Sequence, residues 1–314
     1  MSSHLIKTVI SLSLFLSQIF SQVIITEVMY DPDTKDSEFV ELFNTSNNTV
    51  DLTGWTIGDE KDADLLKEKD AGDGLKLKPL GYAVILEDDY TGIYDSMIPS
   101  NALLTKIDDG NIGYRGLAQS DAVYLKDSAD TLIDSYGWAD PAPDNFSIEK
   151  VWLDQPNTPD NWKPSRNPLG TPGAPNSVAP LNIDGKISNN IIFTPRYPKP
   201  GESVIVTVTV ENTGVQNIGG IVSATFNNKI IGFANSPVLS SRATATINIP
   251  LNLLPSGRHE ITFQFSVDND DNFTNNTKVK KLGVAFDPGT VTINEFLSNP
   301  GDNQIEFIEL VSSK

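Results

Sequence analysis

Six glutamates, placed identically in two stretches of the chain, are the residues whose type and spacing could do chemistry. They are Glu27, Glu38 and Glu41 in the first stretch and Glu295, Glu306 and Glu309 in the second. Two carboxylates on neighbouring strands can flank a glycosidic bond or coordinate a cation. A residue set that recurs in every copy of a module is more typical of a requirement of the fold than of an active site. We therefore expect these glutamates to flank the edge of a β-sandwich and to pair with strand or loop donors.

The two stretches are copies of one segment. Residues 23–43 and 291–311 align without a gap at an offset of 268, and eight of the 21 aligned positions are identical. A self-match of this kind indicates a module that recurs along the chain. Two strands alone are marginally stable. We therefore expect residues 291–314 to be an incomplete module, and the chain to be the N-terminal part of a longer repetitive protein.

The N-terminus and the cysteine content indicate an exported protein. Residues 8–20 form an apolar run too short to span a membrane, and the small residue Ser21 follows. This pattern predicts a signal peptide at residues 1–21; the alternative is a buried N-terminal helix. The chain has no cysteine, which excludes disulfides and thiolate metal sites and is common in exported bacterial proteins.

The charge is concentrated in the first half of the chain. Residues 23–177 hold 29 acidic and 12 basic residues, whereas residues 178–314 hold 12 and 10. An acidic surface repels phosphate backbones, so the sequence argues against a nucleic-acid partner. The acidic segments 59–74 and 87–95 exceed what strand connections need. They are the predicted sites of any recognition, with a weak preference for cations such as Ca²⁺.

Short runs that alternate apolar and polar residues are interrupted about every 8–15 residues by Gly, Pro, Asn and Asp. This spacing predicts antiparallel sandwiches and not helices that cross between parallel strands. In the first module they are expected at residues 24–29, 38–43, 49–52, 55–57, 82–86, 122–126, 131–136 and 147–153. Residues 161–177 contain four prolines, which exclude a central strand there. In the second module, residues 203–211, 243–249 and 261–267 alternate apolar and polar residues with a period of two, typical of sheets with one solvated face.

The predicted fold class is therefore all-β, with tandem immunoglobulin-like β-sandwiches and a truncated third module. The predicted organisation is a signal peptide at 1–21, a sandwich at 23–177, a linker at 178–186, a sandwich at 187–284 and the first strands of a further module at 291–314.

The remaining candidates for chemistry are weak. Asp268, Asp270 and Asn272 match the first three ligand positions of a calcium loop, but Phe273 and Val279 replace the glycine and the glutamate that such a loop requires. A polar turn is the favoured alternative.

Neither the histidine nor the tryptophans strengthen the case for an active site. His259, the histidine that remains after removal of the signal peptide, is expected to be a surface residue. The four tryptophans, Trp55, Trp138, Trp152 and Trp162, could stack on sugars, but core packing is favoured. We find no GxSxG motif and no phosphate-binding loop. We therefore predict no catalytic residue and no cofactor-binding residue.

Two families resemble parts of the chain. ITEVMYDP (residues 25–32), DSEFVELFN (36–44), VDLTGWTI (50–57), GYAVIL (81–86), DSYGW (134–138), NW (161–162) and GTPGAPN (170–176) occur in the order seen in the lamin tail domain family, and residues 291–314 resemble its first two strands. Residues 187–284 resemble the bacterial cell-adhesion-related domain through PKPGESVIVTVTVENTG (198–214) and LLPSGRHEITFQFSVDNDDNFTNN (253–276). Both resemblances imply immunoglobulin-like sandwiches with structural or recognition roles and no catalysis.

The expected function is that of an exported, non-catalytic modular protein that acts as a scaffold, adhesion or display protein. Its expected location is extracellular or at the cell surface, and its expected partner is a protein or glycan there. The alternative is a targeting or binding accessory of a secreted hydrolase or nuclease whose catalytic domain would follow residue 314. Bacterial lamin tail domains often accompany such enzymes.

Overall fold

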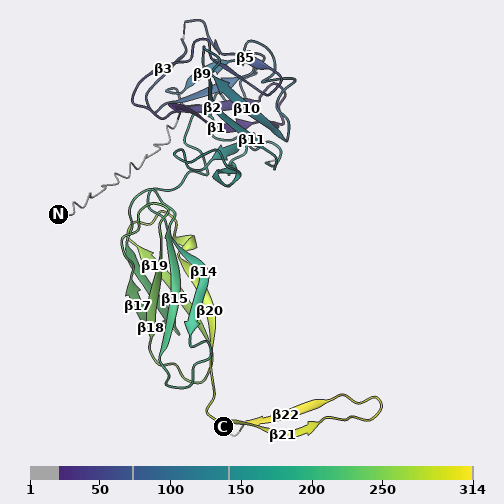
Figure 1. The fold of residues 1–314 in the computed structure, drawn as a ribbon, viewed down its shortest axis with the longest axis vertical. Coiled ribbons are helices and arrows are strands. Elements are labelled where there is room, and N and C mark those ends of the chain that lie inside the picture. Colours follow the sequence, from purple (N-terminus) through teal and green to yellow (C-terminus); the bar gives the residue numbers. More distant parts are fainter. Residues whose placement is uncertain (1–20, 73, 141, 313–314) are drawn as a thin grey trace, which may run out of the picture. The chain divides into compact units, whose positions relative to one another are not determined.

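The computed structural model describes residues 21–72, 74–140 and 142–312. The chain divides into two compact units, Met1–Ala179 and Pro180–Lys314, and both are built from strands (Figure 1). The signal peptide predicted at residues 1–21 lies, except for Ser21, outside the described residues. Within the described ranges, no helix is long and apolar enough to cross a membrane.

The first unit is a sandwich of two main sheets. The larger has the strand order β13-β12-β1-β2-β8-β9-β6 and the smaller has the order β11-β10-β4-β5, while β3 and β7 form a separate pair. The strands of the larger sheet are Trp162–Pro164 (β13), Ile148–Lys150 (β12), Val23–Met29 (β1), Phe39–Asn44 (β2), Tyr82–Leu86 (β8), Leu103–Lys106 (β9) and Lys67–Glu68 (β6). The others are Leu132–Trp138 (β11), Asp121–Lys126 (β10), Thr56–Gly58 (β4), Ala63–Leu65 (β5), Val50–Asp51 (β3) and Lys76–Leu77 (β7), and a 3₁₀ turn spans Pro159–Asn161 (η1).

The larger sheet is covered on both faces around β1, β2 and β8. All seven residues of β1 and five of the six in β2 are buried. In β8, Ala83 and Ile85 belong to the main core, whereas Val84 and Leu86 pack with Tyr94 in a second cluster on the opposite face. A polar side chain on either face of these strands is therefore removed from water and needs partners within the protein.

The second unit contains a sandwich of a three-stranded sheet, β14-β15-β18, and a four-stranded sheet, β17-β16-β19-β20. Its strands are Gly185–Thr194 (β14), Val204–Asn212 (β15), Gly220–Phe226 (β16), Lys229–Asn235 (β17), Thr244–Leu251 (β18), Gly257–Val267 (β19) and Thr277–Val284 (β20), and a 3₁₀ turn spans Phe273–Asn275 (η2). Alternate residues of β15, from Val204 to Val210, are buried. The alternation predicted for this strand is confirmed, because one face of the sheet packs on the other sheet and the opposite face meets water. The all-β, tandem-sandwich fold class is confirmed as well.

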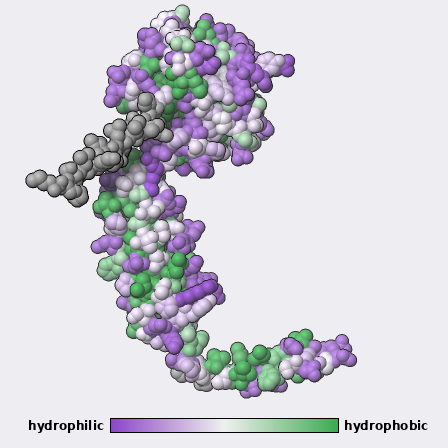
Figure 2. Space-filling model, in the orientation of Figure 1, coloured by the Kyte–Doolittle hydropathy of each residue, from purple (hydrophilic) through white to green (hydrophobic). Residues whose placement is uncertain are grey.

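The repeated segment forms a hairpin of its own at the end of the chain. Val291–Leu297 (β21) and Phe307–Ser312 (β22) make a two-stranded sheet. Its apolar side chains are exposed, and hydrophobic surface follows the hairpin in Figure 2.

The structure corrects the prediction that residues 59–74 and 87–95 are solvated connections in excess of the fold. β5 and β6 lie in the first segment, where Leu66 is buried in the core and the buried Asp64 Oδ2 accepts a hydrogen bond from the Gly113 amide at 2.6 Å. In the second segment Glu87 is also buried. These residues help to build the sandwich, and they went unrecognised because their strands are too short to show a period.

The boundary between the units falls inside the predicted linker 178–186. Val178 is buried, and β14 begins at Gly185, two residues before the predicted start at 187. The short strand β13, which contains Pro164, lies at the edge of its sheet as the proline argument requires.

Candidate functional site

Three glutamates form a row across three neighbouring strands of the larger sheet. Glu27 on β1 pairs with Glu41 on β2 and with Glu149 on β12. All three residues are 0 % exposed. The register of β1 shifts between Ile25 and Glu27, so a β-bulge precedes the row. β1 and β2 are interior strands, which corrects the expectation that Glu27 and Glu41 flank the edge of the sandwich.

Residues 170–178, the cap segment, close over this row and provide most of its donors. The Thr171 amide donates to Glu27 at 2.8 Å, and the Gly173 amide donates to Glu41 at 2.7 Å. The Ser177 hydroxyl and the Val178 amide donate to Glu149 at 2.7 and 3.0 Å. The expectation that loop donors satisfy these carboxylates is confirmed.

Hydroxyl groups of the strands complete the set. Thr26 Oγ1 donates to Glu41 at 2.7 Å, and Ser147 Oγ donates to Glu27. Thr171 Oγ1 lies 3.2 Å from Glu27 Oε2 and 3.0 Å from Glu149 Oε1. Each of the six carboxylate oxygens thus has a hydrogen-bond partner in the protein, as buried polar groups require.

The close approach of the cap segment depends on Gly170. Its φ of +76° favours glycine, and a Cβ placed on it would lie 2.0 Å from Glu27 Oε1 and 2.6 Å from Ser147 Oγ. Any side chain here would force the segment away from the carboxylates.

Burial and mutual repulsion favour the protonated form of the row. Burial, followed by the charge of Glu149, raises the pKa of Glu27 from 4.5 to about 8. Burial, followed by the charge of Glu27, raises the pKa of Glu41 well above its ordinary value. The donors from Ser147, Thr171 and Gly173 offset part of this increase.

Glu38, the third glutamate expected from the repeat, is not hydrogen-bonded to this row. Its carboxylate accepts a bond from the Leu117 amide at 2.9 Å, while its own amide donates to Glu87 at 2.9 Å. Burial raises the pKa of Glu38 to about 8 and the pKa of Glu87 to about 7. These two acids also fasten separate segments of the first unit together.

The geometry of the row limits its chemistry. A glycosidase carboxylate must contact its substrate, and a cation site needs oxygens that are free to coordinate. While the cap segment is in place, the three carboxylates cannot contact a substrate, and their oxygens are not free to coordinate a cation. Among the described residues, no group of three or more His, Cys, Asp and Glu side chains is arranged to hold a metal ion.

The calcium candidates of the second unit are engaged in a turn. Asp270 is buried, and its two oxygens accept bonds from the Gly185 and Asn272 amides at 2.9 and 2.8 Å. Asn272 Oδ1 accepts from the Thr274 amide, and Asp268 is exposed. This arrangement favours the polar-turn interpretation, and calcium binding at these residues stays a prediction.

The structure corrects the placement of His259, which is buried and not on the surface. Its Nε2 lies 2.6 Å from the Pro255 carbonyl oxygen, and its ring meets the Phe226 ring edge-to-face. The core-packing interpretation holds for three tryptophans, Trp55, Trp138 and Trp162, all of which are buried. Tyr136 stacks on Trp162 with ring centroids 3.7 Å apart.

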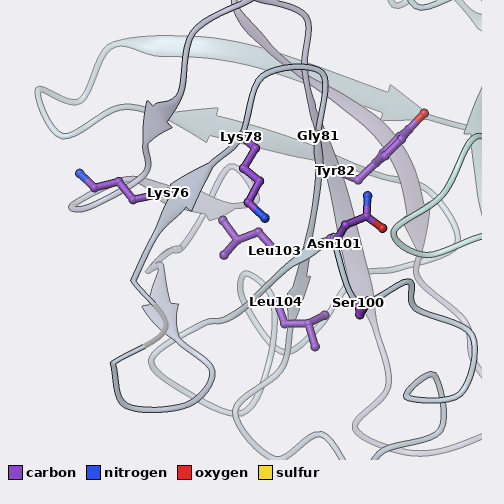
Figure 3. A pocket seen from close by; sticks show the side chains of 9 residues that line it. Lys76, Lys78, Gly81, Tyr82, Ser100, Asn101, Leu103 and Leu104 are labelled. Atoms are coloured by element: carbon purple, nitrogen blue, oxygen red, sulfur yellow. The ribbon is translucent and has the colours of Figure 1, made fainter.

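An open recess of about 380 Å³ lies on the surface of the first unit. It is lined by Lys76, Lys78, Gly81, Tyr82 and residues 100–104. Figure 3 shows Lys78 reaching toward Leu103, whereas Lys76 and the Tyr82 ring point outward. Lys76 is paired with Asp51. The recess can admit a small polar group, but it has no carboxylate or histidine in its lining.

Residues 18–140 match the family model of the Lamin Tail Domain. The first unit carries a lamin tail domain. The matched segment includes Glu27 and Glu41, but it ends before Glu149 and before the cap segment of the lamin-tail unit.

Solved structures show weaker likenesses to parts of the chain. The CARDB domain of a Pyrococcus furiosus protein is 16 % identical over 34 % of this chain and 96 % of that domain, with a TM-score of 0.29. A domain of a putative cell surface protein from Methanosarcina acetivorans is 19 % identical over 33 % of this chain and 93 % of that domain, also with a TM-score of 0.29. A β-glucosidase from Listeria innocua is 15 % identical over 43 % of this chain but only 19 % of the enzyme, with a TM-score of 0.26. At these scores none of the likenesses bears on function, and a search of curated proteins gave no match.

Sequence reasoning identified Glu27 and Glu41 through the repeat and missed Glu149, Thr171 and Ser177. The GTPGAPN motif at residues 170–176 is a turn signal, with two glycines and a threonine that can donate hydrogen bonds. Nothing in the local pattern shows that this turn lies over a strand about 140 residues earlier.

Proposed function

We propose that the chain is an exported, non-catalytic modular protein whose two sandwiches serve as a scaffold or display unit at the cell surface. The observation that carries this proposal is the state of the glutamate row. Glu27, Glu41 and Glu149 are fully buried, and all their oxygens are hydrogen-bonded within the lamin-tail unit. Acids in this state are held by hydrogen bonds inside the fold and do not contact a substrate.

Other features support the same proposal. The apolar run at residues 8–20 has the length of a signal-peptide core. The chain has no cysteine, as is common in exported bacterial proteins. The net charge of −18 favours solubility and disfavours nucleic acid as a partner. A protein or glycan of the cell surface is the proposed partner, and the open recess beside Lys78 is the proposed point of contact.

The catalytic half of the proposal is tested with the purified chain from residue 22 onward. We expect no turnover of nucleic acid, phosphoester or glycan substrates. Turnover that disappears in Glu41→Gln, in a variant whose tryptophan emission shows an intact first unit, would contradict the proposal.

The export half is tested on cells that produce the full chain. Protease added to intact cells should degrade the protein, and sequencing of the secreted or surface form should find Gln22 at its N-terminus. Protection from the protease until the cells are lysed, together with an N-terminus that retains residues 8–20, would place the protein inside the cell.

A further inference from the structure

Lys150, the last residue of β12, is a buried lysine whose amine is not paired with an acid. It lies on the same face of the strand as Ile148, a residue of the main core, and is 3 % exposed. Among the described residues, its amine makes no hydrogen bond and no ion pair. Burial lowers the pKa of Lys150. This environment favours the neutral amine, which is a nucleophile.

Three observations place the Lys150 side chain beside Asn157. Lys150 pairs with Trp162 across β12 and β13, so their Cβ atoms are about 5 Å apart on one face of the sheet. The Trp162 indole N–H donates to Asn157 Oδ1 at 3.2 Å. The charge of Asp134 acts on Lys150, and Asp134 Oδ1 accepts a hydrogen bond from Asn157 Nδ2 at 2.8 Å. Lys150 and Asn157 therefore share two neighbours, Trp162 and Asp134.

The Asn157 carboxamide is held at both ends. Besides its bond to Asp134, its nitrogen donates to the Ser135 carbonyl oxygen at 2.8 Å. Its oxygen faces the indole N–H of Trp162, which is itself fixed by stacking on Tyr136 with ring centroids 3.7 Å apart. A donor at this oxygen stabilises the negative charge that develops there when a nucleophile attacks Cγ.

Asp134 is placed to move a proton at the same carboxamide. Its Oδ2 accepts a hydrogen bond from the Ile25 amide at 2.8 Å, and its Oδ1 accepts one from the Ser135 amide at 2.9 Å, so the carboxyl group is fixed. Burial raises the pKa of Asp134. A carboxyl group with a raised pKa, in contact with the amide nitrogen, can act as general acid and general base.

We propose that Lys150 and Asn157 join through an amide bond between their side chains, with Asp134 as the proton carrier. The lone pair of Lys150 Nζ attacks Asn157 Cγ and forms the new N–C bond. Asp134 takes one proton from the lysine nitrogen and delivers one to the amide nitrogen. The Cγ–Nδ2 bond then breaks, and ammonia leaves.

This cross-link forms once in each molecule and involves no turnover. Asp134 ends in the state in which it began, and the reaction consumes no oxidant, reductant or second molecule. The bond ties β12 to the segment that follows it, in a chain that has no cysteine for a disulfide. It is independent of where the protein is located and of what it contacts.

Peptide mass spectrometry of the folded chain from residue 22 onward tests the proposal. Trypsin cleaves after a free lysine, and no other lysine or arginine lies between residues 150 and 157. Digestion therefore separates Lys150 from Asn157 unless the lysine amine is acylated. We expect both residues in one peptide that is lighter than its sequence by one ammonia, with fragmentation placing the bond between them.

Two results of this measurement would overturn the proposal. Separate peptides of unaltered mass would show that no cross-link forms. A peptide lighter by one water, with Lys150 joined to Asp134, would show that the carboxyl group and not the carboxamide is the acceptor. Neither result depends on the folding of a variant.

Variants test the role of each side chain. All four tryptophans lie in the first unit, so their emission reports whether that unit is folded. Lys150→Arg and Asp134→Asn should both leave Asn157 unlinked while the emission stays native. Lys163→Arg, at an exposed lysine on the neighbouring strand β13, is the matched control and should keep the cross-link. A cross-link that persists in Asp134→Asn would contradict the role of Asp134 as the proton carrier.

Discussion

At the residue scale, the glutamate row shares one hydroxyl between two carboxylates. Thr171 Oγ1 is within hydrogen-bond distance of both Glu27 and Glu149, yet a threonine hydroxyl has one proton to donate. Both contacts are hydrogen bonds if one carboxyl group is protonated and donates to Thr171. The raised pKa of Glu27, about 8, agrees with a proton held in the row at neutral pH.

This arrangement predicts that the first unit loses stability as the pH rises. The pKa of Glu27 is raised from 4.5 to about 8, and the pKa values of Glu41, Glu38 and Glu87 are raised as well. A raised folded-state pKa means that the folded unit binds more protons than the unfolded chain. For Glu27 the stabilisation is therefore complete below about pH 4.5 and is lost as the pH rises through about 8, and the other three groups act in the same direction.

Urea unfolding followed by tryptophan emission at pH 5, 6, 7 and 8 measures this pH dependence. The free energy of unfolding should decrease steadily across the series. A value that is constant or increases toward pH 8 would show that the row is ionised in the folded protein.

Glu27→Gln tests the effect of ionisation alone, because glutamine has nearly the same shape as glutamate but carries no titratable proton. The amide oxygen can accept from Thr171 N and Ser147 as Oε1 does, and the amide nitrogen can donate to Thr171 Oγ1, which then donates to Glu149. We expect the variant to unfold at a higher urea concentration than the wild type at pH 8, and its stability to depend less on pH. Glu260→Gln, at an exposed ion pair with Lys281, is the control and should leave the first unit unchanged. An unfolded Glu27→Gln variant would show that the charge itself is required.

At the element scale, the sequence predicts the strands whose own residues show an apolar pattern. It misses the short strands that form only because they hydrogen-bond to segments far away in the sequence. The strand at 82–86 was predicted with the observed bounds, and the alternation in β15 is confirmed. The two-residue strand β6 takes its hydrogen bonds from β9, far along the chain, so its own residues show no pattern. The same reason explains the missing part of the site, because the cap segment is defined by contacts with β1 and β12 and not by its own sequence.

Gly170→Ala tests the contact between the cap segment and the row. The positive φ alone costs an alanine about 1–2 kcal/mol, and the added Cβ would also collide with Glu27 Oε1. Gly74→Ala is a matched control in the same unit, with φ +72° and no atom within 4 Å of the added Cβ. We expect Gly170→Ala to lower the free energy of unfolding of the first unit by clearly more than the control, measured by urea titration of tryptophan emission. Equal losses would mean that the cap segment moves aside without cost.

Deletion of residues 291–314 tests whether the hairpin contributes to either sandwich. Its strands pair only with each other within the described residues, and its apolar side chains are exposed. The melting temperatures of both sandwiches should stay the same, and solubility should rise because an exposed apolar edge is removed. Tryptophan emission reports on the first unit and circular dichroism reports on both. A decrease of several degrees would show that the hairpin packs on one of the sandwiches.

At the scale of the whole molecule, the chain is a series of sandwiches with acids concentrated in the first. Repetition of residues 23–43 as residues 291–311 was the sequence signal that identified the modules, and it also identified two of the three glutamates in the row. The same signal could not tell whether those acids face solvent or the interior. That distinction depends on coverage of the sheet by residues 87–102 and 170–178, which only the folded chain shows.

Carboxyl labelling tests most directly the central claim that the acids able to do chemistry are sealed inside the fold. The folded chain is treated at neutral pH with a water-soluble carbodiimide and an amine, and each site is quantified by peptide mass spectrometry. Glu27, Glu41 and Glu149 should remain unlabelled until the first unit is unfolded with urea, while exposed acids such as Asp62 and Asp130 react in the folded state. Labelling of Glu27 or Glu41 in the folded chain at a rate similar to that of Asp62 would contradict the account, because it would show that the row is open to a substrate.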